Sequence, residues 1–361
     1  MFNYSGRICY LLSIFMMLGS LACSPKKYSE GMYAEISTTK GQIVIKLEFE
    51  KTPLTVANFC GLAEGTIENN VFPLETPFYD GSKFHRVVPG HVIQTGAPDT
   101  EEEIGCGYTI PNEIHPALSH SQPGMAGMAN SGPHTNGSQF YITLGDRSYL
   151  DGDYSLFGEV IQGMDTVNNI QIGDEIISIN IVRIGKEAKK FKCDHKTFTA
   201  MLQTSKEKQI QDDQEKILKE NEKIQNTWPE AISTQSGLKY VILEEGEGET
   251  PSEGDKIQVL YSGSTLEGKK FVSTQEHGRP EYGSEPEIFT FEIGKSSINP
   301  GFDEAMTEMK KGEKRILILP AALSYSVQGY YGPEKEGEQR FFLSPNTTLI
   351  YEVAIIEINS D

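Results

Sequence analysis

The sequence has few cysteines, few basic residues relative to acidic ones, and only one long apolar run. Its five cysteines are scattered and form no C-x-x-C pair, which argues against a disulfide-rich scaffold. With 32 basic and 51 acidic residues the formal net charge is −19, and this balance argues against a nucleic-acid-binding protein, which needs clustered Lys and Arg for phosphate contacts. The mean hydropathy of −0.38 excludes a polytopic membrane protein.

The sequence does contain enough apolar material for more than one folded domain. Its 361 residues suggest two or three domains, and 37% hydrophobic residues are sufficient for their cores. Charge divides the chain into three parts. Residues 31–185 hold 7 basic and 19 acidic side chains, residues 186–232 hold 10 and 9, and residues 233–361 hold 12 and 22. The middle part is therefore nearly neutral and differs from the two acidic parts.

The apolar run lies at the N-terminus. After Arg7, residues 8–18 are mostly apolar, a length that suits a signal peptide and is short for a membrane-spanning helix. The run G-S-L-A-C-S ending at Ser24 resembles a bacterial lipobox. The resemblance implies a signal peptide over 1–22, lipidation of Cys23, a tether over 23–31 and a lipid-anchored protein of the cell envelope, with the outer membrane favoured. A plain cleaved signal is the alternative.

The nearly neutral part, residues 186–232, is predicted to be a helical linker. It has no Gly and no Pro before Pro229, and it is rich in Lys, Glu and Gln, which favour helix. Ile210, Ile217 and Ile224 recur every seven residues, but charged residues occupy the companion positions of the heptad. We expect one long helix that docks lightly on a neighbour. A dimerising or client-binding helix is the alternative.

The first acidic part has the pattern of a β-rich domain. Apolar residues alternate with others over 43–49, which is strand periodicity. Pro53 then opens a predicted helix that Gly65 closes. We expect one face of this helix to be apolar, through Val56, Phe59, Cys60 and Ala63.

Several runs in this part resemble the cyclophilin family of peptidyl-prolyl isomerases. They are F-H-R-V-V-P-G (84–90), Q-T-G (94–96), G-M-A-N-S-G-P (127–133), T-N-G-S-Q-F-Y (135–141), Y-L-D-G (149–152) and F-G-E-V (157–160). The resemblance implies a closed β-barrel domain over 32–185 that catalyses rotation about X-Pro amides.

This chemistry requires no nucleophile, metal or cofactor. Amide rotation crosses a barrier of about 18–20 kcal/mol, and the twisted nitrogen regains a lone pair that a donor can stabilise. The resemblance implies that Arg86 is this donor and that Gln94 holds Arg86 and the substrate backbone. An Arg86 with a structural role in an inactive pocket is the alternative. The implied substrate-binding residues are His91, Val92, Ala129, Asn130, Phe140, Tyr141, Tyr149, Leu150 and Tyr154, with Val92, Phe140, Tyr141 and Leu150 as walls of the proline pocket.

The first part departs from the family pattern at four of these positions. His91 replaces a pocket aromatic residue, Val92 a methionine, Tyr149 an indole and Tyr154 a histidine. We expect His85 to be a buried structural histidine and residues 101–103 to form a solvated loop. No reactive or metal-binding role is expected for Cys60, Cys106 or Cys193.

The last part, residues 233–361, resembles a second isomerase family, the FKBPs. The runs are G-L-K-Y-V-I-L-E-E-G (237–246), V-L-Y-S-G (259–263), L-E-G-K-K-F (266–271), F-T-F-E-I-G (289–294), G-F-D-E-A (301–305) and P-N-T-T-L-I-Y (345–351). The resemblance implies an antiparallel sheet wrapped on one helix and an apolar cup that desolvates the prolyl amide. The implied cup residues are Tyr261, Phe271, Phe289, Ile298, Asn299, Phe302, Tyr325 and Tyr351.

The departures from the second family are heavier. Val272 stands where the family has an Asp, Phe302 where it has an indole, and Asn299 where it has an Ile. Ser326 follows Tyr325 in place of a Gly, and insertions around 275–288 and 329–340 lengthen loops beside the cup. A proline-binding or client-binding module with little turnover is therefore the alternative for this domain.

These resemblances predict a multi-domain, β-dominated α+β protein, organised as cyclophilin-like barrel, helical linker and FKBP-like sheet. The predicted function is peptidyl-prolyl isomerisation and protein folding. The expected partners are proline-containing unfolded clients, cyclosporin and FK506-type inhibitors and, through the lipid anchor, a membrane. A client-binding chaperone or scaffold is the alternative. No nucleic acid, metal or cofactor is expected.

Overall fold

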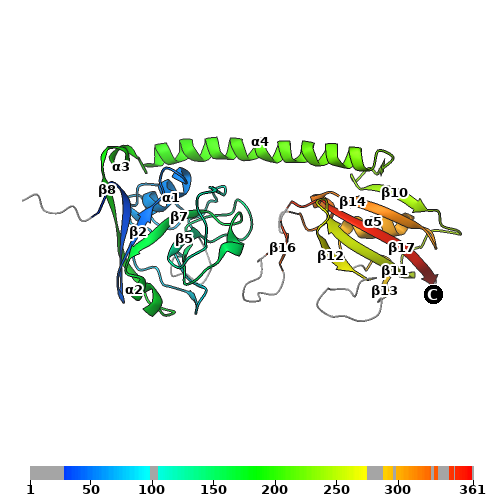
Figure 1. The fold of residues 1–361 in the computed structure, drawn as a ribbon, viewed down its shortest axis with the longest axis horizontal. Coiled ribbons are helices and arrows are strands. Elements are labelled where there is room, and N and C mark those ends of the chain that lie inside the picture. The colour runs from blue at the N-terminus through cyan, green and yellow to red at the C-terminus, as the bar shows by residue number, and fades with distance from the viewer. Residues whose placement is uncertain are drawn as a thin grey trace, which may run out of the picture.

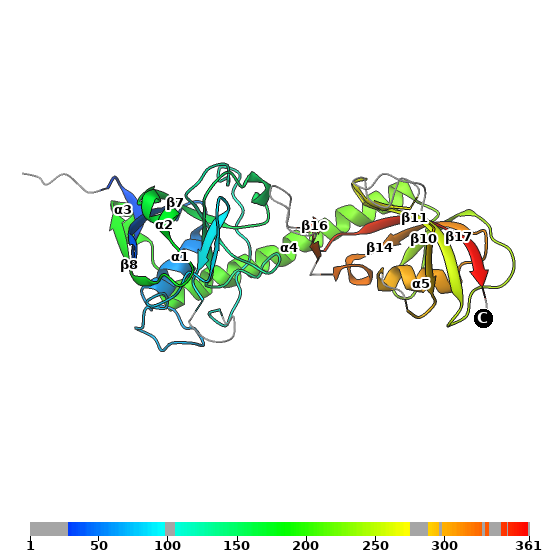
Figure 2. The same ribbon diagram turned by 90° about the horizontal axis from the view of Figure 1, so that it is seen from below.

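Two β-sheet domains lie at opposite ends of one long helix, α4 (Figures 1 and 2). This arrangement agrees with the β-dominated architecture that the sequence predicted. The computed structural model describes residues 28–97, 105–274, 288–295, 298–326, 329–331, 341–344 and 346–359.

The first domain is an eight-stranded antiparallel sheet in the order β3-β4-β6-β5-β7-β2-β1-β8. Its two ends meet, because the Phe84 N–H donates to Asp174 O at 2.8 Å and the Ile176 N–H donates to Ser82 O at 2.9 Å. The sheet therefore closes into a barrel. The strands are β1 (Gly31–Thr38), β2 (Gly41–Leu47), β3 (Arg86–Val88), β4 (Val92–Thr95), β5 (Met125–Met128), β6 (Phe140–Thr143), β7 (Leu156–Gln162) and β8 (Ile176–Ile184).

The sequence predicted one apolar face for helix α1 (Pro53–Ala63). In the structure the helix is buried on every side. One side packs into the barrel core, where Phe59 contacts Phe140 and Phe157, and another contacts α4. The Glu113 carboxylate accepts hydrogen bonds from the first-turn N–H groups of Leu54 and Thr55 at 3.1 and 2.6 Å. These satisfy donors that the helix itself leaves unpaired. Two shorter helices complete the domain, α2 (Met164–Asn169) and the 3-10 turn η1 (Ser148–Leu150).

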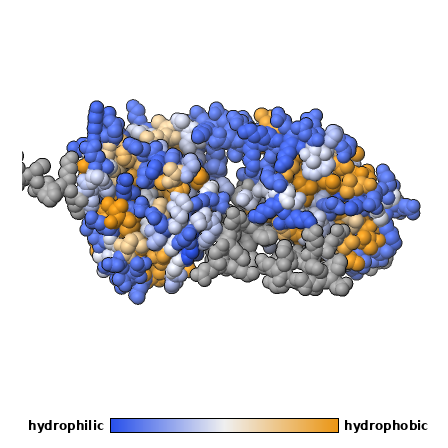
Figure 3. All heavy atoms as spheres, viewed as in Figure 1, coloured by the Kyte–Doolittle hydropathy of each residue, from blue (hydrophilic) through white to orange (hydrophobic). Residues whose placement is uncertain are grey.

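The linker forms two helices, not the single one expected. Helix α3 (Lys186–Lys190) ends at Phe191, and α4 (His195–Thr227) begins after Asp194, whose side chain accepts from the Thr197 N–H at 3.0 Å. This N-cap explains the break, because a capping residue has a non-helical backbone. Figure 3 shows mainly hydrophilic residues along the outer side of α4.

The ends of α4 dock on different domains. Near its start, the Phe198 ring lies 5.5 Å from that of Tyr108 in the first domain. Near its end, Ile224 is buried with Leu266 and Ile318 of the second domain, and Trp228 packs on the same cluster. Ile210 and Ile217 between them are both 57% exposed. Of the three isoleucines that recur every seven residues, only Ile224 therefore anchors the helix.

The second domain is an antiparallel sheet in the order β12-β11-β17-β14-β10-β9, with β13 also paired to β11. Helix α5 (Pro300–Glu308) packs against it, and Asn299 caps this helix by accepting from the Phe302 N–H at 3.0 Å. The strands of this sheet are β9 (Ile232–Ser233), β10 (Lys239–Glu244), β11 (Lys256–Thr265), β12 (Lys270–Ser273), β13 (Phe289–Glu292), β14 (Lys314–Leu319) and β17 (Leu349–Asn359). Outside the sheet lie a 3-10 turn, η2 (Ala321–Leu323), and a pair of short strands, β15 (Tyr330–Tyr331) and β16 (Phe341–Leu343).

None of the helices in the described part of the chain has the length and apolar character needed to cross a membrane. Residues 1–27, which include the predicted signal peptide and Cys23, lie outside the described residues, as do residues 98–104.

Candidate active site

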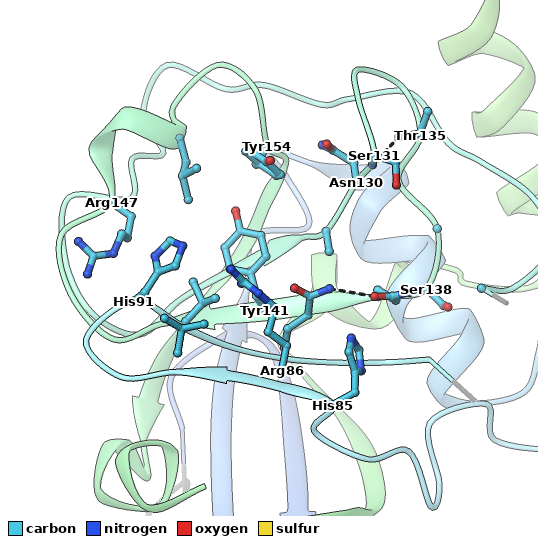
Figure 4. Close-up of a pocket in the computed structure, with 18 of the residues that line it drawn as sticks. His85, Arg86, His91, Asn130, Ser131, Thr135, Ser138, Tyr141, Arg147 and Tyr154 are labelled. Atoms are coloured by element: carbon cyan, nitrogen blue, oxygen red, sulfur yellow. Dashed lines mark hydrogen bonds between the residues drawn. The ribbon is translucent and has the colours of Figure 1, made fainter. Parts of the chain in front are cut away.

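A cleft of about 1060 Å³ opens on the first domain, beside strands β3, β4 and β6 (Figure 4). We call it the first-domain cleft. Its walls include ten of the eleven residues assigned to this site from the sequence: Arg86, His91, Val92, Gln94, Ala129, Asn130, Tyr141, Tyr149, Leu150 and Tyr154. Residues from five separate sequence runs therefore converge on one cavity.

Strand register explains why Arg86, Gln94 and Tyr141 share this cleft. Arg86 on β3 pairs with Gln94 on β4, and Gln94 pairs with Tyr141 on β6. Residues directly opposite each other on neighbouring strands point to the same face of a sheet. The three residues consequently form a row across the cleft floor, which we call the Arg86 row.

Phe140 is the exception among the predicted pocket walls. It precedes Tyr141 on β6 and therefore points to the opposite face, into the barrel core. Its ring is 1% exposed and lies 5.6 Å from Tyr79. Phe140 is a core residue, so its assignment to the pocket wall was wrong.

The end of the cleft beyond the Arg86 row is apolar. Val92, Tyr141, Leu150 and Tyr154 form a small buried cluster, with Ala129 and Tyr149 packed against it. The Tyr154 ring lies 6.0 Å from that of Tyr141 in an edge-to-face arrangement. The chemistry of this cluster suits a prolyl ring, since small-molecule sites are mostly apolar with few polar groups.

Two histidines line the first-domain cleft. His85 is exposed and lines the cleft, so the prediction of a buried structural residue was wrong. It lies directly before β3, where the chain emerges at the surface. His91 is at the partly exposed edge, where its ring stacks at 6.3 Å on Tyr149. Its polar ring therefore lies at the mouth and not in the apolar end.

The polar side of the cleft is held by amide side chains. The Gln94 Nε2 donates to Gln139 Oε1 at 2.9 Å. Asn130 donates to Asp153 O at 3.1 Å and accepts from the Gly132 N–H at 3.3 Å. Gln139 was not assigned to the site, although it stands inside the T-N-G-S-Q-F-Y run. The fixed amides hold this wall of the cleft in one arrangement.

Sequence reasoning also missed His120. This side chain is 1% exposed, and its Nε2 lies 2.7 Å from the hydroxyl of Tyr141. Burial lowers the pKa of His120, and the hydrogen bond with Asp151 opposes that effect. His120 is 21 residues from Tyr141 in the sequence, and no local pattern indicates that the fold brings them together.

The aromatic residues predicted for the second domain also meet. Tyr261 lies 5.3 Å from Phe302 and 5.8 Å from Phe289, and Phe271 lies 5.7 Å from Tyr351. Ile298 and Tyr325 pack against the same cluster. Burial raises the pKa values of the Tyr261, Tyr325 and Tyr351 hydroxyls.

The base of this aromatic cluster is closed. Phe302 and Tyr351 are 0 and 1% exposed, so they are core residues that cannot touch a ligand in this structure. The Asn299 side chain donates to the Tyr351 hydroxyl at 3.0 Å and also caps α5. Ser326 has a positive φ of 52° where the family has Gly, a conformation that costs a non-glycine residue energy. The loops inserted beside the cluster lie largely outside the described residues.

Comparison with known proteins agrees with both resemblances. Residues 33–189 match the family model "Cyclophilin type peptidyl-prolyl cis-trans isomerase/CLD". Peptidyl-prolyl cis-trans isomerase A of Mycobacterium tuberculosis is 46% identical over 132 residues, covering 36% of this chain and 72% of that protein. This chain belongs to the cyclophilin-type peptidyl-prolyl cis-trans isomerases.

Further proteins are similar to this chain. Peptidyl-prolyl cis-trans isomerase B of Streptomyces anulatus is 41% identical over 136 residues, covering 37% of this chain and 78% of that protein. A crystal structure of a Cryptosporidium parvum cyclophilin aligns at 28% identity and a TM-score of 0.37, covering 43% of this chain and 99% of that one. Residues 247–356 match the family model "FKBP-type peptidyl-prolyl cis-trans isomerase". The chain thus combines two isomerase domains and is a peptidyl-prolyl cis-trans isomerase.

Proposed function

We propose that the first-domain cleft is the main isomerase site and that Arg86 stabilises the twisted amide. The observation that supports this most directly is the Arg86 row, which sets a guanidinium beside an apolar prolyl-sized pocket. The prolyl ring would occupy the cluster of Val92, Leu150 and Tyr154. Its amide nitrogen would then face Arg86, whose guanidinium keeps its charge at all physiological pH values.

Gln94 has a supporting role in this proposal. Its side chain is anchored by Gln139, so it can offer its remaining amide groups to Arg86 and to the substrate backbone without reorganising. Catalysis then consists of binding one planar amide and favouring its twisted form. No covalent bond is made or broken, and only the resonance of the amide is lost as it rotates.

The test is isomerisation of an X-Pro peptide by full-length Arg86→Ala. Loss of a preorganised donor to a transition state typically costs about 10²–10³ in rate, so we expect kcat/KM of the first site to fall by that factor. The matched control is Lys46→Ala, which removes an exposed cation on β2 outside the cleft. Equal activity of Arg86→Ala and the control would refute the proposal.

The second domain is proposed to bind clients and to contribute weaker turnover. The closed base at Phe302 and Tyr351 favours binding over rapid catalysis, whereas the half-buried Tyr261, Phe289 and Tyr325 leave a contact surface. Activity that remains in Arg86→Ala and disappears in Arg86→Ala/Tyr325→Ala would show turnover there. If Arg86→Ala has no residual activity, the second domain is a binding module without turnover.

We further propose that the protein is a folding factor anchored in the cell envelope through lipidated Cys23, with its two domains holding one client at two prolines. The lipobox-like run supports the anchor. Helix α4 supports the spacing, because its 33 residues span about 50 Å at 1.5 Å per residue. Fractionation of Cys23→Ser, with Cys9→Ser as its control, tests the anchor. Retention of Cys23→Ser in the membrane fraction would contradict it.

A further inference from the structure

A chain of three polar side chains, buried except at Asp151, lies behind the apolar wall of the first-domain cleft. The Nδ1 of His120 lies 2.6 Å from Asp151 Oδ1, and its Nε2 lies 2.7 Å from the Tyr141 hydroxyl. The His120 and Tyr141 rings are also stacked, with centroids 6.0 Å apart and an interplanar angle of 21°. We call Asp151, His120 and Tyr141 the relay.

The proton positions in the relay follow from its surroundings. Burial alone would raise the pKa of Asp151, but hydrogen bonds from Ser119 and from the backbone and ring of His120 lower it overall. Asp151 is therefore a carboxylate and accepts the proton of His120 Nδ1. Because burial keeps His120 neutral, its Nε2 has a free lone pair and accepts from the Tyr141 O–H. Each polar atom of the chain is thus paired.

A glycine makes room for this arrangement. Gly127 on β5 is directly opposite Tyr141 on β6. A Cβ at Gly127 would lie 2.5 Å from the Tyr141 hydroxyl oxygen and 2.6 Å from Cζ, closer than real Cβ contacts allow. The Tyr141 ring therefore lies directly over Gly127 of β5.

We propose that His120, held by Asp151, is a positioning residue that fixes the Tyr141 ring over Gly127 and thereby sets the width of the proline pocket. The inference rests on the proposed function of the first-domain cleft. Without the hydroxyl anchor, the ring is no longer held over Gly127 and can turn into the cleft that it lines, where the prolyl ring would lie. The relay then acts on substrate binding more than on amide rotation, so its loss raises KM more than it lowers kcat.

Full-length Tyr141→Phe tests the relay with the smallest change, because it removes one hydroxyl and keeps the ring. A hydrogen bond of ordinary net strength corresponds to about a two- to tenfold effect, and we expect KM to rise by that factor with kcat nearly unchanged. Rates from Arg86→Ala are subtracted, so that only the first-domain cleft is measured. The matched control is Tyr79→Phe, which loses another buried hydroxyl bond, to Ser138 O at 3.0 Å, in the barrel core.

A second variant separates positioning from general destabilisation. Gly127→Ser should raise KM strongly in the native chain, because its side chain collides with the Tyr141 hydroxyl. In the Tyr141→Phe background the new side chain still meets the ring at Cζ, but the ring is no longer held by His120 and can move aside, so the same change should add less to KM. The two substitutions are therefore expected to be non-additive in KM. Thermal unfolding of each variant is measured alongside.

Two results would overturn the inference. One is an unchanged KM in Tyr141→Phe, and the other is strict additivity of Tyr141→Phe and Gly127→Ser. Tyr79→Phe should lower stability without raising KM, and an equal KM rise in that control would also count against a specific relay. If Arg86→Ala retains full activity, the proposed function fails. If Arg86→Ala is inactive and Tyr141→Phe is unaffected, only the relay fails.

Discussion

A buried ion pair in the second domain allows a sharp prediction of stability. Glu313 and Arg315 are 3 and 5% exposed, and Arg315 Nε donates to Glu313 Oε1. The pair is further held by the Lys310 N–H, which donates to Glu313 Oε2 at 2.9 Å, and by the Tyr240 ring, 4.2 Å from the guanidinium. Glu313→Ala leaves the cation buried without its carboxylate.

The expected cost is large because water cannot replace the missing partner. Breaking a buried pair from one side typically lowers the free energy of unfolding by about 3–5 kcal/mol. An exposed pair in the same domain provides the control: Lys311 Nζ lies 2.7 Å from Glu357 Oε1, with side chains 52 and 40% exposed. Glu357→Ala should cost at most about 1 kcal/mol. The two pairs differ mainly in burial.

The assay uses the chain's single tryptophan. Trp228 packs against the cluster that Ile224 of α4 forms with Leu266 and Ile318 of the second domain, so its fluorescence during urea unfolding reports on that domain. Glu313→Leu/Arg315→Met removes both charges and should restore much of the stability that Glu313→Ala loses. The reasoning is refuted if Glu313→Ala costs no more than Glu357→Ala, or if the double replacement is as unstable as the single one.

Acidification should destabilise the first domain. Burial lowers the pKa of His120 and His134 below the ordinary 6.5. As the pH falls, the unfolded chain therefore takes up protons before the folded one does. The free energy of unfolding should be constant above about pH 6.5 and fall as the pH drops from there toward the folded-state pKa values; denaturation at several pH values checks this, and a rise on acidification would contradict it. Alkylation should distinguish the thiols of Cys193 and Cys60. A hydrogen bond from Cys60, with a contribution from Arg183, lowers the pKa of Cys193. Burial raises the pKa of Cys60. Mapping of iodoacetamide-labelled peptides near neutral pH should find Cys193 modified first, and the reverse order would show the assignment to be wrong.

Local patterns in the sequence were sufficient for much of the fold. Apolar alternation over 43–49 predicted a strand, and β2 covers residues 43–47 of that range, with Ile43, Ile45 and Leu47 in the barrel core. Asn299 followed by Pro300 is a typical capping pattern for a helix start, and α5 begins there. The break between α3 and α4 was missed, because helix-favouring composition outweighed the single capping signal at Asp194.

The sequence was sufficient to predict those site residues that lie within the family-like runs. Arg86, Gln94 and Tyr141 belong to recognisable runs, and all three line the cleft. Phe140 was misassigned because the run alone does not say which of two adjacent aromatic residues faces the core.

By itself, the sequence determined that the chain has two acidic, β-rich isomerase domains joined by a helical segment, since composition, periodicity and family motifs are local properties. Only the tertiary structure decided that His120, Asp151 and Gly127 gather around Tyr141. It likewise decided that Ile224 alone of the heptad isoleucines is buried. Both depend on which strands and helices the folded chain brings together, and contacts between distant segments leave no periodic signal in the sequence.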